Sequence, residues 1–128
     1  TMQVNPNYED VMSQIYAYFE KEIEKAVKRG IDYKKIIIDP GIGFGKRLDD
    51  NITILKRLRE FKSLGRPLLV GPSRKSFIGI ILEKSADQRL NGSLASCACA
   101  IMNGADIIRV HDVAEVYEMT KVIDRIIR

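Results

Sequence analysis

The sequence lacks the long apolar segments that direct a chain into or across a membrane. No apolar run approaches the roughly 18 residues that a membrane-spanning helix needs. The first residues also lack the basic start and apolar stretch of a signal peptide. We therefore expect a cytoplasmic protein without a membrane-spanning segment.

Cysteine and histidine are scarce, with two copies of the first and one of the second. Cys97 and Cys99 stand two positions apart, so on a helix they point about 200° away from each other. This direction argues against a mutual disulfide or a shared metal, and we interpret both as small buried thiols in a reducing compartment. No cluster of His, Cys and Glu resembles a zinc site, and no Ser-His-Asp arrangement is suggested.

Charge of one sign is not concentrated anywhere in the chain. The net charge is +4, and the Lys and Arg residues are scattered among 17 acidic residues. A nucleic-acid-binding surface needs basic residues gathered on one face, so we expect no nucleic-acid partner. A modest positive excess suits a site for small anionic molecules.

The pattern of apolar residues predicts an α/β protein with a parallel sheet. Helices are expected over 8–29, 50–63, 74–83, 92–103 and 113–127, and short strands buried on both faces over 35–38, 67–70 and 106–110. Right-handed crossovers between three consecutive parallel strands place every helix on one side of the sheet. The other apolar face would be bare, so we interpret the chain as part of a larger barrel.

Polar residues follow directly after each predicted strand. Asp39 and Gly71 begin the first two polar segments, and Arg109 borders the third. Because parallel strands end at one edge of their sheet, all three segments lie at that edge. In α/β proteins the active site is built at that edge. This agreement between three loops predicts an enzyme.

The first loop, 39–46, is rich in glycine but fits neither of two known phosphate-binding patterns. Gly41 and Gly45 enclose three residues instead of the four of a P-loop, and Lys46 stands where the dinucleotide fingerprint has its third glycine. Two interpretations of Asp39 remain open. Its carboxylate could accept two hydrogen bonds from an amidine-like edge of a heterocycle, or it could cap the turn. Phe44 could likewise be a ligand contact or ordinary loop packing.

The second loop places Ser73, Arg74, Lys75 and Ser76 at the predicted start of a helix, where anions are favoured. Lys75 could donate to a carbonyl or ring nitrogen, and Ser76 could bind a carboxylate. The alternative is a serine cap followed by two solvated cations. Because cations are mildly unfavourable at that end of a helix, two of them favour a bound anion.

In the third loop, Arg109 and His111 are two positions apart, so their side chains lean to one face. Such a cationic pair suits a pyrophosphate. Alternatively, Asp112 could pair with Arg109, and the single histidine could be structural.

Four segments together resemble the dihydropteroate synthase family. They have that family's order and spacing, and they are Ile-Asp-Pro-Gly-Ile-Gly-Phe-Gly-Lys at 38–46, Leu-Val-Gly-Pro-Ser-Arg-Lys-Ser-Phe-Ile-Gly at 69–79, Gly-Ser-Leu-Ala at 92–95 and Ile-Arg-Val-His-Asp-Val at 108–113. The resemblance implies a (β/α)8 barrel, of which the chain holds the sixth to eighth strands and lacks the first five. The whole of 1–128 would be the C-terminal part of one pterin-binding domain.

The resemblance also implies the reaction and the roles of particular residues. Such enzymes join p-aminobenzoate to 7,8-dihydropterin pyrophosphate with Mg²⁺ and are inhibited by sulfonamides. Asp39 and Lys75 would act in catalysis and, with Arg109 and His111, would bind the pterin pyrophosphate. The expected contacts to p-aminobenzoate are Phe44, Gly71, Pro72, Ser73, Arg74 and Ser76. The Mg²⁺ ligand is expected in the missing N-terminal half, the complete enzyme is expected to be a homodimer, and the chain alone is expected to be inactive.

Two other functions fit parts of the pattern. A pterin-binding methyltransferase barrel shares the acid at position 39, but it has no need for the Arg-Lys-Ser segment or for a pyrophosphate-binding Arg and His. A non-catalytic fragment that oligomerises through its bare sheet face is the alternative from a different class.

Overall fold

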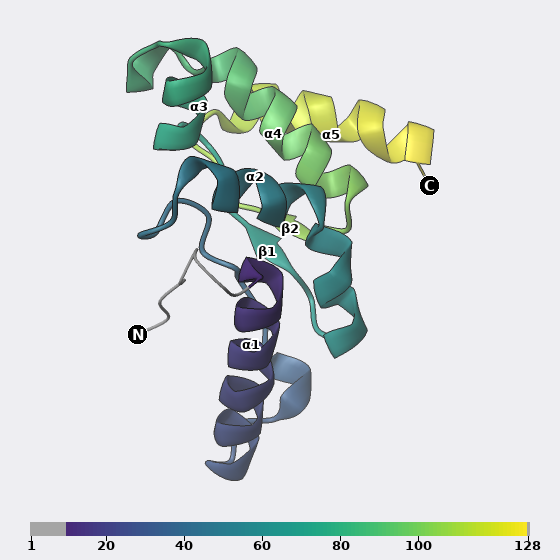
Figure 1. The fold of residues 1–128 in the computed structure, drawn as a ribbon. Helices are drawn as coiled ribbons and strands as arrows, with labels where there is room; N and C mark the ends of the chain where they lie inside the picture. The colour runs from purple at the N-terminus through teal and green to yellow at the C-terminus, as the bar shows by residue number, and fades with distance from the viewer. Residues whose placement is uncertain (1–9, 128) are drawn as a thin grey trace.

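The computed structural model describes residues 10–127, in which helices pack against a small parallel sheet (Figure 1). The elements in chain order, with η for a 3-10 helix, are α1 (Val11–Lys28), η1 (Tyr33–Lys35), α2 (Leu48–Lys56), η2 (Leu58–Leu64), β1 (Leu69–Val70), α3 (Ser76–Leu82), η3 (Ala86–Gln88), α4 (Leu90–Met102), β2 (Ile107–Ile108) and α5 (Val113–Ile127). The five predicted helices and the strands predicted over 67–70 and 106–110 appear in this order, whereas no strand is found within 35–38. The predicted first helix included residues 8 and 9, which lie outside the described residues.

Three parallel chain segments lie side by side at the centre of the fold. The paired residues are Leu69 with Ile107, Val70 with Ile108, and, as an isolated bridge, Ile38 with Leu68. The predicted strands over 67–70 and 106–110 are therefore shorter than expected, and 35–38 is a single bridge instead of a strand. The reason is that a strand exists only where a neighbouring backbone completes the hydrogen-bond ladder.

The two faces of this sheet differ in their exposure to solvent. Ile38, Leu68 and Val70 are buried under the helices, whereas Ile37 is 52% exposed and Ile107 is 38% exposed on the other face. The prediction that the strands are buried on both faces is wrong for the described residues. The exposed isoleucines instead fit the prediction that one apolar face is left uncovered.

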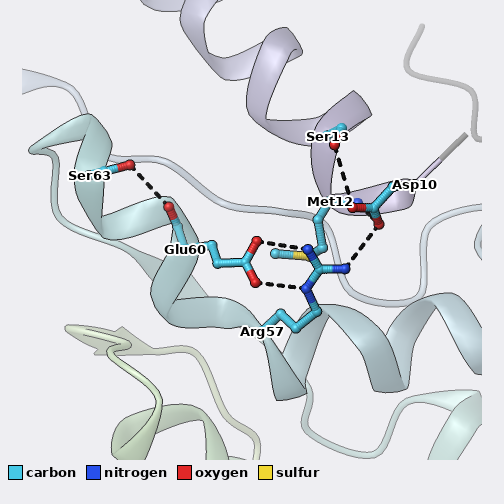
Figure 2. Close-up of polar contacts among 6 residues, drawn as sticks. All are labelled: Asp10, Met12, Ser13, Arg57, Glu60 and Ser63. Atoms are coloured by element: carbon cyan, nitrogen blue, oxygen red, sulfur yellow. Dashed lines mark hydrogen bonds and ion pairs between the residues drawn. The ribbon is translucent and has the colours of Figure 1, made fainter.

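Helix α1 begins at Val11 because Asp10 caps it, with its Oδ1 accepting the Met12 amide at 3.1 Å. Figure 2 shows how the same carboxylate joins α1 to η2. Arg57 donates to Asp10 Oδ1 at 3.2 Å and to both carboxylate oxygens of Glu60 at 2.7 and 2.9 Å. Beneath this surface network the Phe19 and Phe61 rings pack edge to face, with 5.4 Å between their centroids.

The predicted helix over 50–63 is two elements, because the chain tightens from α2 into the 3-10 helix η2 before Gly65 ends it in a left-handed conformation. Both parts contribute to one core, since Ile54, Leu58 and Phe61 are fully buried. The last helix, α5, has the predicted bounds, although its Ile126 is exposed.

Helix α4 carries the two cysteines on different sides. Cys97 is buried and Cys99 is exposed, and both are free thiols. The prediction that they do not pair is confirmed, and the prediction that both are buried is wrong for Cys99. Within residues 10–127 no helix has the length and apolar character to cross a membrane.

Candidate active site

The loop after Ile38 is shaped by glycines and by the side chain of Asp39. Asp39 Oδ1 accepts the Gly41 amide at 2.8 Å, which closes the turn. Gly41, Gly43 and Gly45 have φ angles of 71°, 92° and 65°, in the left-handed region that favours glycine. Asp39 thus caps the turn with one oxygen, while its Oδ2 is directed to the segment after β2.

Arg109 reaches that second oxygen from the end of β2. Its Nη2 lies 3.4 Å from Asp39 Oδ2, and both side chains keep contact with solvent. The guanidinium also passes close to Gly71, where an added Cβ would lie 3.3 Å from Arg109 Nε. The absence of a side chain at Gly71 therefore lets Arg109 cross the end of β1 toward Asp39.

Lys75 brings a second cation to the same place. Its ammonium donates to the Ile42 carbonyl at 2.9 Å and lies 4.3 Å from the centre of the Phe44 ring. Burial lowers the pKa of Lys75, Arg109 lowers it further, and Asp39 opposes the change. Lys75 is thus held less basic than an ordinary lysine.

Lys46 is a third cation in this cluster. Its ammonium donates to the Gly41 carbonyl at 2.8 Å. Burial lowers the pKa of Lys46, with Lys75 lowering it further and with Asp39 and Asp50 raising it. Three cations and one carboxylate therefore share the ends of the three parallel segments, which is an arrangement suited to an anionic ligand.

The segment from Ser73 to Ser76 differs from the predicted helix start. Helix α3 begins only at Ser76, Lys75 is its N-cap, and Arg74 is a non-glycine residue at φ 55°. The Arg74 guanidinium donates to both carboxylate oxygens of Asp112, at 2.6 and 3.2 Å. The alternative of a serine cap followed by two solvated cations is therefore wrong for Arg74, and its pairing removes it from the argument for a bound anion.

Asp112 is consequently paired with Arg74 and is not the partner of Arg109 that the sequence left open. The Arg74 guanidinium lowers the pKa of Asp112, mainly through its hydrogen bonds to the carboxylate and to a lesser extent through its charge. Two further hydrogen bonds hold the turn. Ser93 Oγ accepts the Arg74 amide at 2.8 Å, and the Arg89 guanidinium donates to the Arg74 carbonyl at 2.9 Å.

His111 is oriented by Ser73, a buried residue on the neighbouring loop. Ser73 Oγ accepts the His111 backbone amide at 3.2 Å and lies 2.9 Å from His111 Nδ1. The Ser73 hydroxyl has one proton and two acceptor sites, so it can hold His111 Nδ1 as well as the backbone amide. With Nδ1 engaged by Ser73, Nε2 is the ring nitrogen directed to a ligand.

The remaining predicted residues lie around this cluster with different exposures. The Phe44 ring is 68% exposed beside Lys75, and Ser76 is exposed at the start of α3. Gly71, Pro72 and Ser73 are buried. Phe44 and Ser76 are therefore accessible to a ligand, whereas the three buried residues act on the shape of the loop.

Two buried polar residues that the sequence reasoning did not identify also contact the loops. Asn51 in α2 accepts the Gly43 amide, and Ser93 in α4 accepts the Arg74 amide, each at 2.8 Å. Both side chains are buried, where an uncompensated polar group would be unfavourable. In the sequence, each could have been found as a polar residue on the predicted buried side of a helix.

The pterin binding enzyme family matches residues 1–111 of the chain. Dihydropteroate synthase of Escherichia coli is 48% identical over 124 residues, which are 97% of this chain and 44% of that protein. The Bacillus subtilis dihydropteroate synthase is 40% identical over 118 residues, covering 92% of this chain and 41% of that protein. The chain thus spans less than half the length of these relatives.

Solved structures show the same relationship. The Yersinia pestis dihydropteroate synthase in a sulfonamide drug complex superposes with a TM-score of 0.92 at 44% identity, covering 97% of this chain and 45% of that chain. The Xanthomonas albilineans dihydropteroate synthase in complex with 7,8-dihydropteroate gives a TM-score of 0.91 at 38% identity, over 94% of this chain and 47% of that chain. These similarities confirm the resemblance that the four sequence segments indicated.

Proposed function

The chain belongs to the pterin binding enzyme family, and on that premise we propose that it forms the C-terminal part of a dihydropteroate synthase. The complete enzyme would join 7,8-dihydropterin pyrophosphate and p-aminobenzoate, releasing pyrophosphate. The observation that carries this proposal is the meeting of Asp39, Lys75 and Arg109 at the ends of three adjacent parallel segments.

We further propose that these three segments are the sixth to eighth strands of a (β/α)8 barrel. The uncovered face with Ile37 and Ile107 supports this, because a barrel fills that face with side chains of the opposite strands. The first five strands would then lie outside the chain. This is also why we expect the chain alone to have no turnover.

In the proposed mechanism, Asp39 would accept hydrogen bonds from the amino-pyrimidine edge of the pterin. Lys75 would donate to the pterin ring from its position over the Phe44 ring. Arg109 and the Nε2 proton of His111 would donate to the pyrophosphate. As the pterin C–O bond breaks, the electron pair and negative charge move onto this leaving group, where fixed cations stabilise it.

The amine nitrogen of p-aminobenzoate would then form the new C–N bond and lose a proton. Phe44 and Ser76 are the accessible side chains that would meet this substrate, with Ser76 near its carboxylate. Gly71, Pro72, Ser73 and Arg74 would shape the pocket from behind. A sulfonamide, which the Yersinia pestis relative binds, would occupy the same place.

Mg²⁺, when bound in such an enzyme, neutralises pyrophosphate charge. Mg²⁺ prefers carboxylate oxygens, and Asp39 is the carboxylate placed among the cations of the site. Asp39 is moreover engaged with Gly41 and Arg109. We propose that the Mg²⁺ ligand lies outside this chain, and that the complete enzyme is a cytoplasmic homodimer without a nucleic-acid partner.

A chimaera tests the function directly. The chain would replace the matching 124-residue segment of the Escherichia coli dihydropteroate synthase, and dihydropteroate formation would be measured. We expect the chimaera to turn over and Lys75→Ala to lower its turnover at least about 100-fold. Lys21→Ala, an exposed lysine on α1, is the matched control and should leave turnover unchanged.

Three results would contradict the proposal. The first is a cooperatively folded chimaera that binds neither pterin pyrophosphate nor p-aminobenzoate. The second is a Lys75→Ala chimaera as active as its parent. The third is steady dihydropteroate production by the isolated 128-residue chain, which would refute its expected inactivity.

A further inference from the structure

The position of the Lys75 ammonium depends on a loop that belongs to a different part of the sequence. Its hydrogen bond goes to the Ile42 carbonyl, and its charge lies over the Phe44 ring. Its side chain runs over Gly43, where an added Cβ would meet Lys75 Cδ at 3.1 Å. A lysine side chain has many rotamers, so these contacts with 42–44 are what restrict it to one place.

The 42–44 loop is in turn held by Asn51 of α2. Asn51 is 2% exposed, and its Oδ1 accepts the Gly43 amide at 2.8 Å. Other backbone amides of this glycine-rich loop donate locally, Gly41 to Asp39 and Phe44 to Gly41. Asn51 therefore ties the middle residue of the loop to a helix.

Asn51 itself has little freedom. It lies in the first turns of α2, and its amide donates to the Arg47 carbonyl at 3.1 Å. Asp50, also buried, accepts the Arg47 amide at 3.2 Å and so fixes the start of the helix. The same side of α2 carries Ile54, which is fully buried. A buried side-chain amide is unfavourable unless it has a hydrogen-bond partner. For the Asn51 oxygen that partner is the Gly43 amide, so holding Gly43 is the role that the structure gives to Asn51.

We infer that Asn51 is a positioning residue for Lys75: its side chain fixes Gly43, and through the 42–44 loop it fixes the carbonyl and the ring that hold the lysine ammonium. The inference rests on the proposed function, since it gives Asn51 a part in the site only if Lys75 contacts the pterin. It adds to that function a residue that touches no substrate.

The experiment uses the 128-residue chain and two readouts that need neither substrate nor turnover. The first is the hydrogen-exchange rate of the Gly43 amide. The second is the pH profile of Lys75 acylation by trace acetic anhydride, with the exposed Lys21 of the same molecule as internal reference. Arg109 and Asp39 act on the Lys75 charge, and Lys46 is a further neighbour, so all three are kept in every variant.

Three substitutions separate the contact from general loosening of the fold. Asn51→Leu keeps the side-chain size and removes the acceptor, whereas Asn51→Asp keeps an oxygen there. Asn103→Leu is the matched control, because Asn103 also makes one partly buried hydrogen bond, from Nδ2 to the Leu55 carbonyl at 2.9 Å. This bond lies at the end of α4 and not at the 42–44 loop.

We expect Asn51→Leu to speed Gly43 exchange about fivefold, the factor for one lost hydrogen bond. With the loop released, Lys75 is less buried, so its pKa should rise toward 10.5. Asn51→Asp should keep Gly43 exchange near the parent rate, and Asn103→Leu should change neither readout.

The inference is overturned if Asn51→Leu speeds Gly43 exchange and leaves the Lys75 profile unchanged, or if Asn103→Leu shifts that profile equally. If Asn51→Leu does not fold, Gly43→Ala takes its place, because the added Cβ would press directly on the Lys75 side chain. An unchanged Lys75 acylation profile in that variant would also overturn the inference. Because neither readout involves catalysis, a failed chimaera with a normal Asn51 result contradicts only the proposed function.

Discussion

Removal of one buried hydroxyl, in Ser93→Ala, should destabilise the turn that carries Arg74 and Lys75. Ser93 is fully buried, and its Oγ accepts the Arg74 amide at 2.8 Å. The substitution leaves that amide without its acceptor, which costs about 1–3 kcal/mol. Arg74 lies at φ 55°, and a side chain there is strained by about 1–2 kcal/mol. If the turn relaxes, part of that strain is released, so we expect a net loss of about 1–2 kcal/mol.

Urea unfolding followed by circular dichroism measures this loss, and the same helix offers a matched control. Ser96, three positions further along α4, donates to the Gly92 carbonyl of its own helix at 2.8 Å, its one side-chain hydrogen bond within residues 10–127. Ser96→Ala should therefore change stability by no more than about 0.5 kcal/mol. The reasoning is refuted if Ser93→Ala and Ser96→Ala have equal midpoints and equal slopes.

Other predictions concern the thiols, the core and the surface. Burial raises the pKa of Cys97 to about 11, so iodoacetamide at pH 8 should modify Cys99 and leave Cys97 intact until the chain unfolds. Because the folded pKa of Cys97 is raised above 9.0, the contribution of its protonated thiol to stability is complete below pH 9 and is lost as the pH rises toward about 11. Unfolding of the parent and of Cys97→Ala, measured across this pH range, would reveal the loss. Phe61→Ala should cost about 3–5 kcal/mol, whereas exposed Phe44→Ala should cost under about 0.5 kcal/mol; similar unfolding midpoints would contradict this. Arg57→Met removes the exposed ion pairs of Figure 2 and should leave the urea-unfolding midpoint close to that of the parent, whereas a clearly lower midpoint would show that these pairs hold α1 in place.

The helices could be predicted from the sequence because their signals are local. Apolar residues at helical spacing mark α1 and α5, and Gly30 ends the first of these at φ 95°. Strand lengths are not local, since they depend on which backbone lies alongside. The isoleucines at 36–38 read as a strand, but only Ile38 has a partner within the described residues, so a bridge results.

The residues of the site could be predicted in part for the same reason. Parallel strands end at one edge of the sheet, and this alone indicated that Asp39, Lys75 and Arg109 would meet. Their individual partners depend on side-chain paths that spacing does not reveal. Arg74 turns to Asp112, 38 positions away, because its own backbone is left-handed. Asn51 lies only eight positions from Gly43 and still escaped notice, since its partner is a backbone amide without any sequence signature.

The pair between Asp39 and Arg109 reconciles the two interpretations of Asp39 that the sequence left open. One carboxylate oxygen caps the turn at Gly41, so the aspartate is structural, while the other oxygen accepts a long bond of 3.4 Å from Arg109. A solvent-accessible ion pair of this kind contributes at most about 1 kcal/mol, so a ligand can replace it with little loss. A heterocycle donating two N–H groups would gain more from the carboxylate than Arg109 does, and it would release the guanidinium for an anion. The turn-capping bond keeps Asp39 in place during this exchange, so in the proposed enzyme its structural role supports its role in binding.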